Sequence, residues 1–198
     1  MRLLRKIAIT GALALTMTGI GLPGAADAEP ACPDRPTARS FAWALDLNSY
    51  FRMPGGDFED GGSSWTLSGG AGVLDGMNET VLPAAPTDSH ALDLPSGSTA
   101  QAAPLCVSGT ATAMRVFARS NGLLGLAVVV VTARDDAGHS QTVLSPAIPL
   151  THAWSAPLLL FRLPLLGDGF TSVTIDVRSI GIGGIAVDDV FVDPLRQR

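Results

Sequence analysis

The chain has 198 residues, and its 18 aspartates and glutamates outnumber its 13 lysines and arginines, which gives a formal net charge of −5 at pH 7. Nucleic acids and anionic membranes bind proteins through basic patches, so this balance argues against both as partners. The length is typical of one domain with a full hydrophobic core.

The N-terminus has the three parts of an export signal. A basic start precedes an apolar run over residues 7–22, and small residues then lead to Ala28. We therefore expect residues 1–28 to be a signal peptide and residues 29–198 to form a single secreted domain. No charge cluster of the stop-transfer kind follows the apolar run, so no membrane insertion is expected after cleavage.

Two cysteines, Cys32 and Cys106, lie in the part that would be exported. An even number of cysteines in an extracellular protein predicts a disulfide. A metal pair and a catalytic thiol are the alternatives, but there is no CxxC motif and neither cysteine has a histidine nearby in the sequence. The bridge would tie the mature N-terminus to the middle of the chain.

The predicted elements are almost all β-strands, bounded by glycine and proline. In chain order they are expected at residues 42–47, 65–67, 90–94, 101–107, 113–120, 123–133, 139–145, 158–163, 171–178 and 184–192. Residues 123–133 and 139–145 flank the turn signal "DDAG" and should form a hairpin. No stretch has the period and caps of a helix. We therefore predict an all-β fold of eight to ten short strands in a sandwich or barrel.

Two of these strands, residues 113–120 and 171–178, alternate regularly and show which side chains share a face. One face of each is apolar. The other faces carry Arg115, Phe117 and Arg119 in the first strand, and Asp176 and Arg178 in the second. If both strands belong to one sheet, these residues form either a groove for a polar glycan or an ordinary solvent face with weak ion pairs.

The sequence carries no catalytic motif, and we expect a protein that is not an enzyme. It lacks GxSxG, HExxH, the Walker loop and the glycine-rich dinucleotide fingerprint. The three histidines are scattered, and no nucleophile pattern accompanies them. Residues 75–89 form the longest irregular segment, which is either a functional loop or a surface connection.

Acidic residues gather in two motifs far apart in the sequence. "GGDFEDGG" contains Asp57, Glu59 and Asp60, and "VDDVFVDP" contains Asp188 and Asp189. Calcium takes six to eight oxygens, and a glycine-rich loop leaves backbone carbonyls free to bind it. The alternative is structural: these carboxylates would cap turns and accept backbone hydrogen bonds where two strands meet.

The same two motifs carry a resemblance to a known family. Phe58-Glu59 followed by Gly61, Trp65 and "GGA", with "VDDVFVDP" near the other end, resembles the galactose-binding-like β-sandwich, or jelly roll, of many carbohydrate-binding modules. The order of motifs also resembles that of small secreted actinobacterial proteins without an assigned activity. The resemblance implies that the two motifs are adjacent, and that Glu59 with Asp188 or Asp189 binds a structural calcium. Met53-Pro54 stands where the family often has an asparagine.

Sugar-binding modules of this kind stack exposed aromatic side chains on sugar rings. Aromatic residues make up only 6% of this chain, and a core claims many of them. The strand context places four in the core: Phe58, Trp65, Phe161 and Phe191. Three remain for a binding platform: Trp43, Tyr50 and Trp154.

We therefore predict a secreted, monomeric, non-catalytic antiparallel β-sandwich that binds a polysaccharide or other glycan. The expected contacts are Arg115, Phe117, Arg119 and Trp154. The alternative is a structural or protein-interaction domain of the cell envelope that has no glycan ligand.

Overall fold

A computed structural model describes residues 32–33, 35–79, 81–82, 88–106, 111–162 and 172–194. The predicted signal peptide, residues 1–28, lies outside this part of the chain, as do several residues of the irregular segment 75–89. Across the described ranges, no helix is long and apolar enough to cross a membrane.

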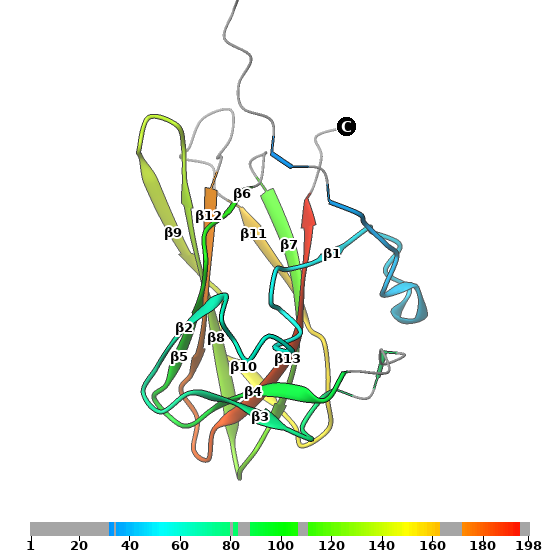
Figure 1. The fold of residues 1–198 in the computed structure, drawn as a ribbon, viewed down its shortest axis with the longest axis vertical. Helices are drawn as coiled ribbons and strands as arrows, with labels where there is room; N and C mark the ends of the chain where they lie inside the picture. The colour runs from blue at the N-terminus through cyan, green and yellow to red at the C-terminus, as the bar shows by residue number, and fades with distance from the viewer. Residues whose placement is uncertain are drawn as a thin grey trace, which may run out of the picture. The chain divides into compact units, whose positions relative to one another are not determined.

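The described residues form 13 strands, which pair antiparallel in two sheets (Figure 1). The six-stranded sheet has the order β11 (Leu158–Arg162), β7 (Ala111–Ser120), β13 (Ile185–Pro194), β4 (His90–Leu94) and β3 (Gly72–Asp75), and β1 (Phe51–Arg52) also pairs with β13. The seven-stranded sheet has the order β10 (Ile148–Leu150), β8 (Gly125–Arg134), β12 (Ser172–Ser179), β5 (Thr99–Ala102) and β2 (Trp65–Ser68); β9 (Ser140–Leu144) pairs with β8, and β6 (Leu105–Cys106) with β12. The predicted antiparallel β-sandwich is confirmed.

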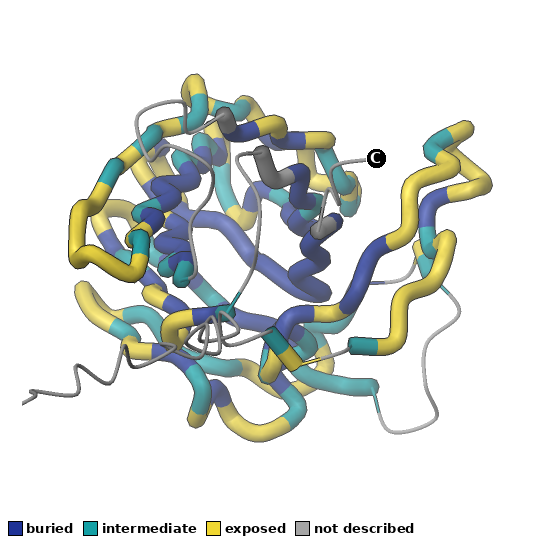
Figure 2. The backbone as a smooth tube through the Cα atoms, turned by 90° about the horizontal axis from the view of Figure 1, so that it is seen from above, coloured by how far each residue is buried: buried dark blue, intermediate teal, exposed yellow. Residues whose placement is uncertain are grey.

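The main core lies between the two sheets, where alternate residues of the facing strands are buried (Figure 2). In β7 the inward residues are Met114, Val116 and Ala118, and in β12 they are Val173, Ile175 and Val177. The alternation predicted for both strands is therefore confirmed. Three of the aromatics expected in the core, Phe58, Trp65 and Phe161, also belong to this cluster.

The predicted hairpin is formed by β8 and β9, with Arg134 opposite Ser140 at its closed end. The backbone N–H of His139 donates to Asp135 Oδ1 at 2.8 Å, which closes the turn. Gly138 adopts a φ of 85°, a conformation that glycine takes without steric cost. The residues of this turn therefore determine the register in which β8 and β9 pair.

Two predicted strands differ from the structure. Residues 42–47 form a short 3-10 helix, η1 (Ala42–Ala44), which ends at Leu45 with a φ of 59°. The predicted strand 101–107 is broken between β5 and β6, where Pro104 has no N–H to donate to a ladder. The short strands β1, β3 and β10 were not predicted, because they are too short to show a period.

A second apolar cluster lies on the outer face of the six-stranded sheet. Phe117 of β7 and Phe191 of β13 are buried there against Phe41 and Tyr50. The ring centre of Phe41 lies 5.8 Å from that of Phe117 and 5.2 Å from that of Phe191. Residues 35–50, which we call the N-terminal strap, thus cover part of this face.

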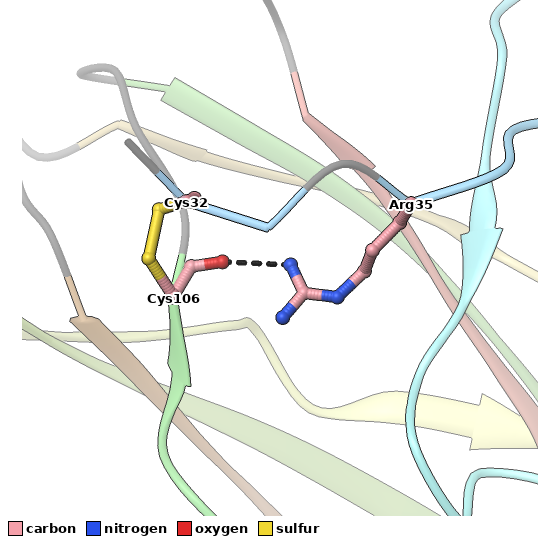
Figure 3. Close-up of a disulfide and its surroundings, with 3 residues drawn as sticks. All are labelled: Cys32, Arg35 and Cys106. Atoms are coloured by element: carbon pink, nitrogen blue, oxygen red, sulfur yellow. Dashed lines mark hydrogen bonds between the residues drawn. A yellow bond between two sulfur atoms is a disulfide. The ribbon is translucent and has the colours of Figure 1, made fainter. Parts of the chain in front are cut away.

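A disulfide anchors the chain just before the strap (Figure 3). Cys32 and Cys106 are bridged with their Cα atoms 5.5 Å apart, so the predicted disulfide is confirmed. Arg35 Nη1 donates to the carbonyl of Cys106 at 2.9 Å, and its guanidinium lies 5.0 Å from the ring centre of Phe51. The start of the strap is therefore tied to both β6 and β1.

Candidate functional site

The two acidic motifs meet in the structure. Val190 of β13 accepts a hydrogen bond from the N–H of Met53 at 2.8 Å and donates its own N–H to the carbonyl of Gly56 at 3.0 Å. The register of β13 against β7 shifts between Asp188 and Val190, and Asp189 there has a φ of 43°. This bulge leaves Asp189 out of the ladder, whereas Asp188 still pairs with Phe117, and both residues lie beside the glycine-rich motif.

Asp188 is fully buried and accepts hydrogen bonds on both oxygens. Its Oδ2 accepts the N–H of Glu79 at 2.7 Å, and its Oδ1 accepts the N–H of Asp189 at 2.8 Å. The carboxylate of Glu79 in turn accepts the N–H groups of Val81 and Leu82. Asp188 therefore holds the segment after β3 in place by accepting backbone hydrogen bonds. This is the structural alternative given for the acidic motifs in the sequence.

Asp189 is buried but less well satisfied. Arg52 Nε lies 3.0 Å from Asp189 Oδ1 and forms an ion pair with it, while Arg52 Nη1 contacts Asp57 Oδ2 at 3.0 Å. The contact of Arg52 Nε with Asp189 lacks the alignment of a hydrogen bond, and neither oxygen of Asp189 has a hydrogen-bond partner among the described residues. Asp189 thus keeps free acceptor capacity in the interior.

Burial shifts the protonation of this acidic group. It raises the pKa of Asp188 to about 8, and the charge of Asp189 adds to the shift. Burial also raises the pKa of Asp189 to about 7, against the opposing effect of Arg52 and with help from Asp88 and Glu79. The pKa values of Glu79 and Asp88 are raised, again chiefly by burial. The single positive charge of Arg52 does not offset the negative charges that these four acids would carry if all were ionised at neutral pH.

The third residue predicted as a metal ligand, Glu59, is held by other groups. Its Oε1 accepts the N–H groups of Ser89 at 2.8 Å and His90 at 2.6 Å, and its Oε2 lies 2.8 Å from His90 Nδ1. Burial alone would raise the pKa of Glu59, but these hydrogen bonds outweigh it and lower the pKa.

One feature of the site favours a structural calcium, and another argues against it. Neither oxygen of Asp189 accepts a hydrogen bond among the described residues, which suits a cation, although Oδ1 already forms an ion pair with Arg52. Yet no group of three or more acids, histidines or cysteines is arranged to hold a metal within the part of the chain that the structure describes. These residues alone do not supply the six to eight oxygens that calcium takes. Calcium at Glu59 with Asp188 or Asp189 stays a prediction.

The predicted glycan contacts of β7 lie on the outer face of the six-stranded sheet, but two of them are covered there. Phe117 is fully buried under the strap. Arg115 forms an ion pair with Asp46 at 2.7 Å, donates to the carbonyl of Ala156 at 2.6 Å and lies over the ring of Phe41. Arg115 and Phe117 therefore hold the strap and offer little surface to a ligand.

The condition that Asp176 and Arg178 share a sheet with Arg115 is not met. Both lie on β12, in the seven-stranded sheet, whereas Arg115 lies on β7, in the other sheet. Asp176 there accepts hydrogen bonds from Gln101 at 2.8 Å and Arg178 at 3.2 Å. Sequence alternation identifies which residues of a strand share a face, but not which strands share a sheet.

Arg119 and Trp154 do come together. The Cζ atom of Arg119 lies 5.3 Å from the ring centre of Trp154, and both side chains are half-buried. The segment between β10 and β11 brings the ring to β7, because Ala118 and Ser155 exchange two backbone hydrogen bonds, of 2.9 and 3.1 Å. Arg119 Nε is buried and has no hydrogen-bond partner among the described residues. The guanidinium thus lies over the ring, and its buried Nε is left without a partner in the described part of the chain.

A polar pair that sequence reasoning missed lies in the same row of the sheet. Asp93 of β4 and Arg119 of β7 both lie opposite Ala186 of β13, so two strand spacings, roughly 10 Å, separate their backbones. Asn121 donates to Asp93 Oδ1 at 2.7 Å. Neither residue belongs to a motif. Asn121 follows Arg119 by two residues in the sequence, whereas Asp93 comes near Arg119 only through the strand pairing.

The other two aromatics considered for a platform differ in exposure. Tyr50 is buried in the second apolar cluster, and its hydroxyl donates to Asp46 at 2.7 Å. Trp43 is exposed on η1. Trp154 is intermediate in exposure: it packs against the second apolar cluster and lies beside Arg119.

No family model matches this sequence, and no curated protein matches it. Solved structures do share its fold. A xylan-binding domain of carbohydrate-binding module family 22 has a TM-score of 0.50 at 17% identity, over 77% of this chain and 99% of that one. The family 22 and GH10 modules of Clostridium thermocellum xylanase 10B, complexed with xylohexaose, have a TM-score of 0.52 at 13% identity, over 71% and 28%.

The tandem family 22 domains of Paenibacillus barcinonensis Xyn10C have a TM-score of 0.51 at 13% identity, over 74% of this chain and 44% of that one. This chain thus spans less than a third of the Clostridium chain and less than half of the Paenibacillus chain. At such identities the likeness shows the fold alone, which is the antiparallel β-sandwich found in carbohydrate-binding modules.

Proposed function

We propose that this protein is a secreted, non-catalytic carbohydrate-binding module whose ligand lies against Trp154 and Arg119. The proposal rests on the contact between these two residues. The ring of Trp154 is half-buried and lies against Arg119, and the Nε of Arg119 has no hydrogen-bond partner among the described residues. The xylan-binding modules that share the fold support the choice of ligand class without identifying the sugar.

The chemistry of the surrounding surface suits a sugar ring. An indole face packs against the apolar face of a pyranose, and its contact with Arg119 fixes the ring orientation before ligand arrives. Arg119 offers donors to hydroxyl groups. Asp93, two strands away, offers an acceptor, and Asn121, just after β7, offers an amide.

Arg115 and Phe117 have a different role in this proposal. Both residues hold the N-terminal strap against the sheet, beside the proposed site. A ligand on Trp154 would therefore meet a surface that is already assembled, which lowers the entropy cost of binding.

Secretion and a structural calcium remain parts of the proposal. The disulfide supports an oxidising compartment, because such bonds are rare in the cytosol. The lack of hydrogen bonds to the oxygens of Asp189 in the described structure supports a cation beside the bulge, next to the ion pair with Arg52. If a calcium binds there, it would neutralise the buried acids and rigidify the motif, and it would take no part in a reaction.

The alternative, a protein-interaction domain without a glycan ligand, is favoured by a different surface. Leu158 and Leu160 are exposed on β11, the edge strand of the six-stranded sheet. A free edge with apolar side chains can pair with an extended segment of another protein.

Native gels that contain single polysaccharides test the proposal. The mature protein should migrate more slowly in at least one gel of a panel of xylan, galactan, mannan, glucan and cell-wall glycans. Albumin serves as the non-binding control in each gel. Unchanged migration across the panel contradicts glycan binding and leaves the protein-interaction alternative.

A further inference from the structure

Two turns lie side by side at one end of the sandwich (Figure 1). The β7–β8 turn and the β12–β13 turn are joined by backbone hydrogen bonds from Leu124 to Ile182 at 3.2 Å and from Asn121 to Gly184 at 3.2 Å. A third bond, from Ile180 to Leu126 at 2.9 Å, closes the same junction. The two turns therefore form one structure.

Four aliphatic side chains project from these turns into solvent. Their exposed fractions are 92% for Leu123, 45% for Leu124, 52% for Ile180 and 69% for Ile182. We call these four residues the aliphatic tip. Neither turn, residues 120–125 or 179–184, contains a charged residue. Single exposed leucines are ordinary on a protein surface, but a contiguous group on two joined turns marks an interaction site.

Glycines hold the tip in this shape. A Cβ added to Gly122 would lie 2.5 Å from the Cα of Gly183, and one added to Gly181 would lie 2.1 Å from the carbonyl oxygen of Leu124. Both contacts are with backbone, which cannot move aside cheaply. The two turns are packed closely enough to present their side chains as a fixed group.

We propose that the aliphatic tip inserts into the surface of a lipid bilayer that carries no net negative charge. Four partly exposed side chains offer a few hundred Å² at most, which is less than the roughly 800 Å² that each partner buries in a protein interface of standard size. A bilayer needs no complementary pocket, and it accepts small apolar groups on a projecting turn. The excess of acids in the chain disfavours an anionic surface.

The strand directions make such insertion possible without burying the rest of the domain. β12 runs from Ser172, opposite Cys106, to Ser179 at the tip. Eight residues of strand span roughly 25 Å, so the disulfide lies at the far end of the sheet. The four aliphatic side chains are distinct from Trp154 and Arg119, although Asn121 lies in the same turn and donates to Asp93 beside the proposed glycan site. The variants tested below leave all of these polar residues unchanged, so the two proposals are tested separately.

Co-sedimentation with sucrose-loaded phosphatidylcholine vesicles tests the proposal. The mature wild-type protein should pellet with the vesicles, and the variant Leu123→Ser/Ile182→Ser should lose about ten-fold or more in partition coefficient. Leu45→Ser/Leu47→Ser is the matched control, because these leucines are 91% and 67% exposed elsewhere on the surface. This control should bind like the wild type. Circular dichroism melting curves establish that both variants are folded.

Four results would overturn the proposal. The first is a wild-type protein that stays in the supernatant, and the second is an equal loss of binding in the control variant. The third is tighter binding when phosphatidylglycerol replaces part of the phosphatidylcholine. The fourth is concentration-dependent dimerisation in sedimentation velocity that Leu123→Ser/Ile182→Ser abolishes, which would assign the tip to a second copy of the chain.

Discussion

Arg115 of β7 and Asp46 of the N-terminal strap form an ion pair at 2.7 Å, although 69 residues separate them in the sequence. Both side chains are largely buried, and Tyr50 donates a further hydrogen bond to the same carboxylate. The pair closes the strap over Phe117 and so converts part of an outer sheet face into a second small core.

Replacing Asp46 with asparagine should destabilise the protein. The asparagine amide keeps an oxygen for Tyr50, but it lacks the charge that compensates the buried guanidinium of Arg115. We expect a loss of about 1–3 kcal/mol in the free energy of unfolding, measured by urea denaturation. Asp135→Asn, which removes an ion pair on the β8–β9 turn, is the control and should leave the midpoint unchanged. Equal losses in the two variants would contradict this account of the strap.

Reduction of the disulfide should lower stability more. Cys32 and Cys106 are 74 residues apart, and chain-entropy estimates for a closed loop of that length are about 4 kcal/mol. The urea midpoint of the wild type in dithiothreitol, and that of Cys32→Ser/Cys106→Ser in its absence, should fall together. A midpoint that reduction does not change would show that the bridge does not constrain the unfolded chain.

The buried acids should make stability fall as the pH rises. The pKa of Asp188 is raised to about 8 and that of Asp189 to about 7, chiefly by burial. In the unfolded chain both lose their protons near their ordinary value of about 4. Between about pH 4 and about pH 8 the folded state therefore binds more protons than the unfolded state, and the free energy of unfolding decreases as the pH rises. Melting curves in EDTA should show the decline levelling off above about pH 8.

The variant Asp189→Asn should flatten that decline, because the asparagine amide does not titrate. A melting temperature that rises steadily from pH 4 to pH 8 in EDTA would instead mean that both carboxylates are ionised and stabilised in the folded protein.

Calcium should reverse the effect if it binds beside the bulge. A cation next to Asp189 neutralises the charge that burial disfavours, and any ligand of the folded state raises its stability. The melting temperature at pH 8 should then rise by several degrees when calcium replaces EDTA, and Asp189→Asn should remove most of the rise. Identical melting curves with calcium and with chelator would eliminate a structural ion.

Local patterns predicted most of the fold, because alternation and turn residues act over a few positions. The strand at residues 90–94 and the β8–β9 hairpin were predicted close to their observed limits. The strap was not, since Phe41 is buried only through contacts with Phe117 and Phe191, which come much later in the chain. Its expected strand at residues 42–47 has no partner to pair with among the described residues and forms a turn of 3-10 helix instead.

The candidate site depended even more on tertiary contacts. Arg119 and Trp154 were both named from the sequence, but their contact follows from a bridge between Ala118 and Ser155 that no local pattern encodes. Asp93 came near only through the register of β13 with its two neighbours. Conversely, Phe117 was expected to face a ligand because alternation identified its face without showing what covers it.

The most direct test of the account is calorimetric titration of two tryptophan variants with oligosaccharides of whichever polysaccharide slows the wild-type protein in gels. Trp154→Ala should weaken binding about ten-fold or more, as expected for a central aromatic contact. Trp43→Ala, which removes an exposed ring from η1, should bind like the wild type. Undiminished affinity in Trp154→Ala, or an equal loss in Trp43→Ala, would contradict the claim that Trp154 and Arg119 form the glycan site.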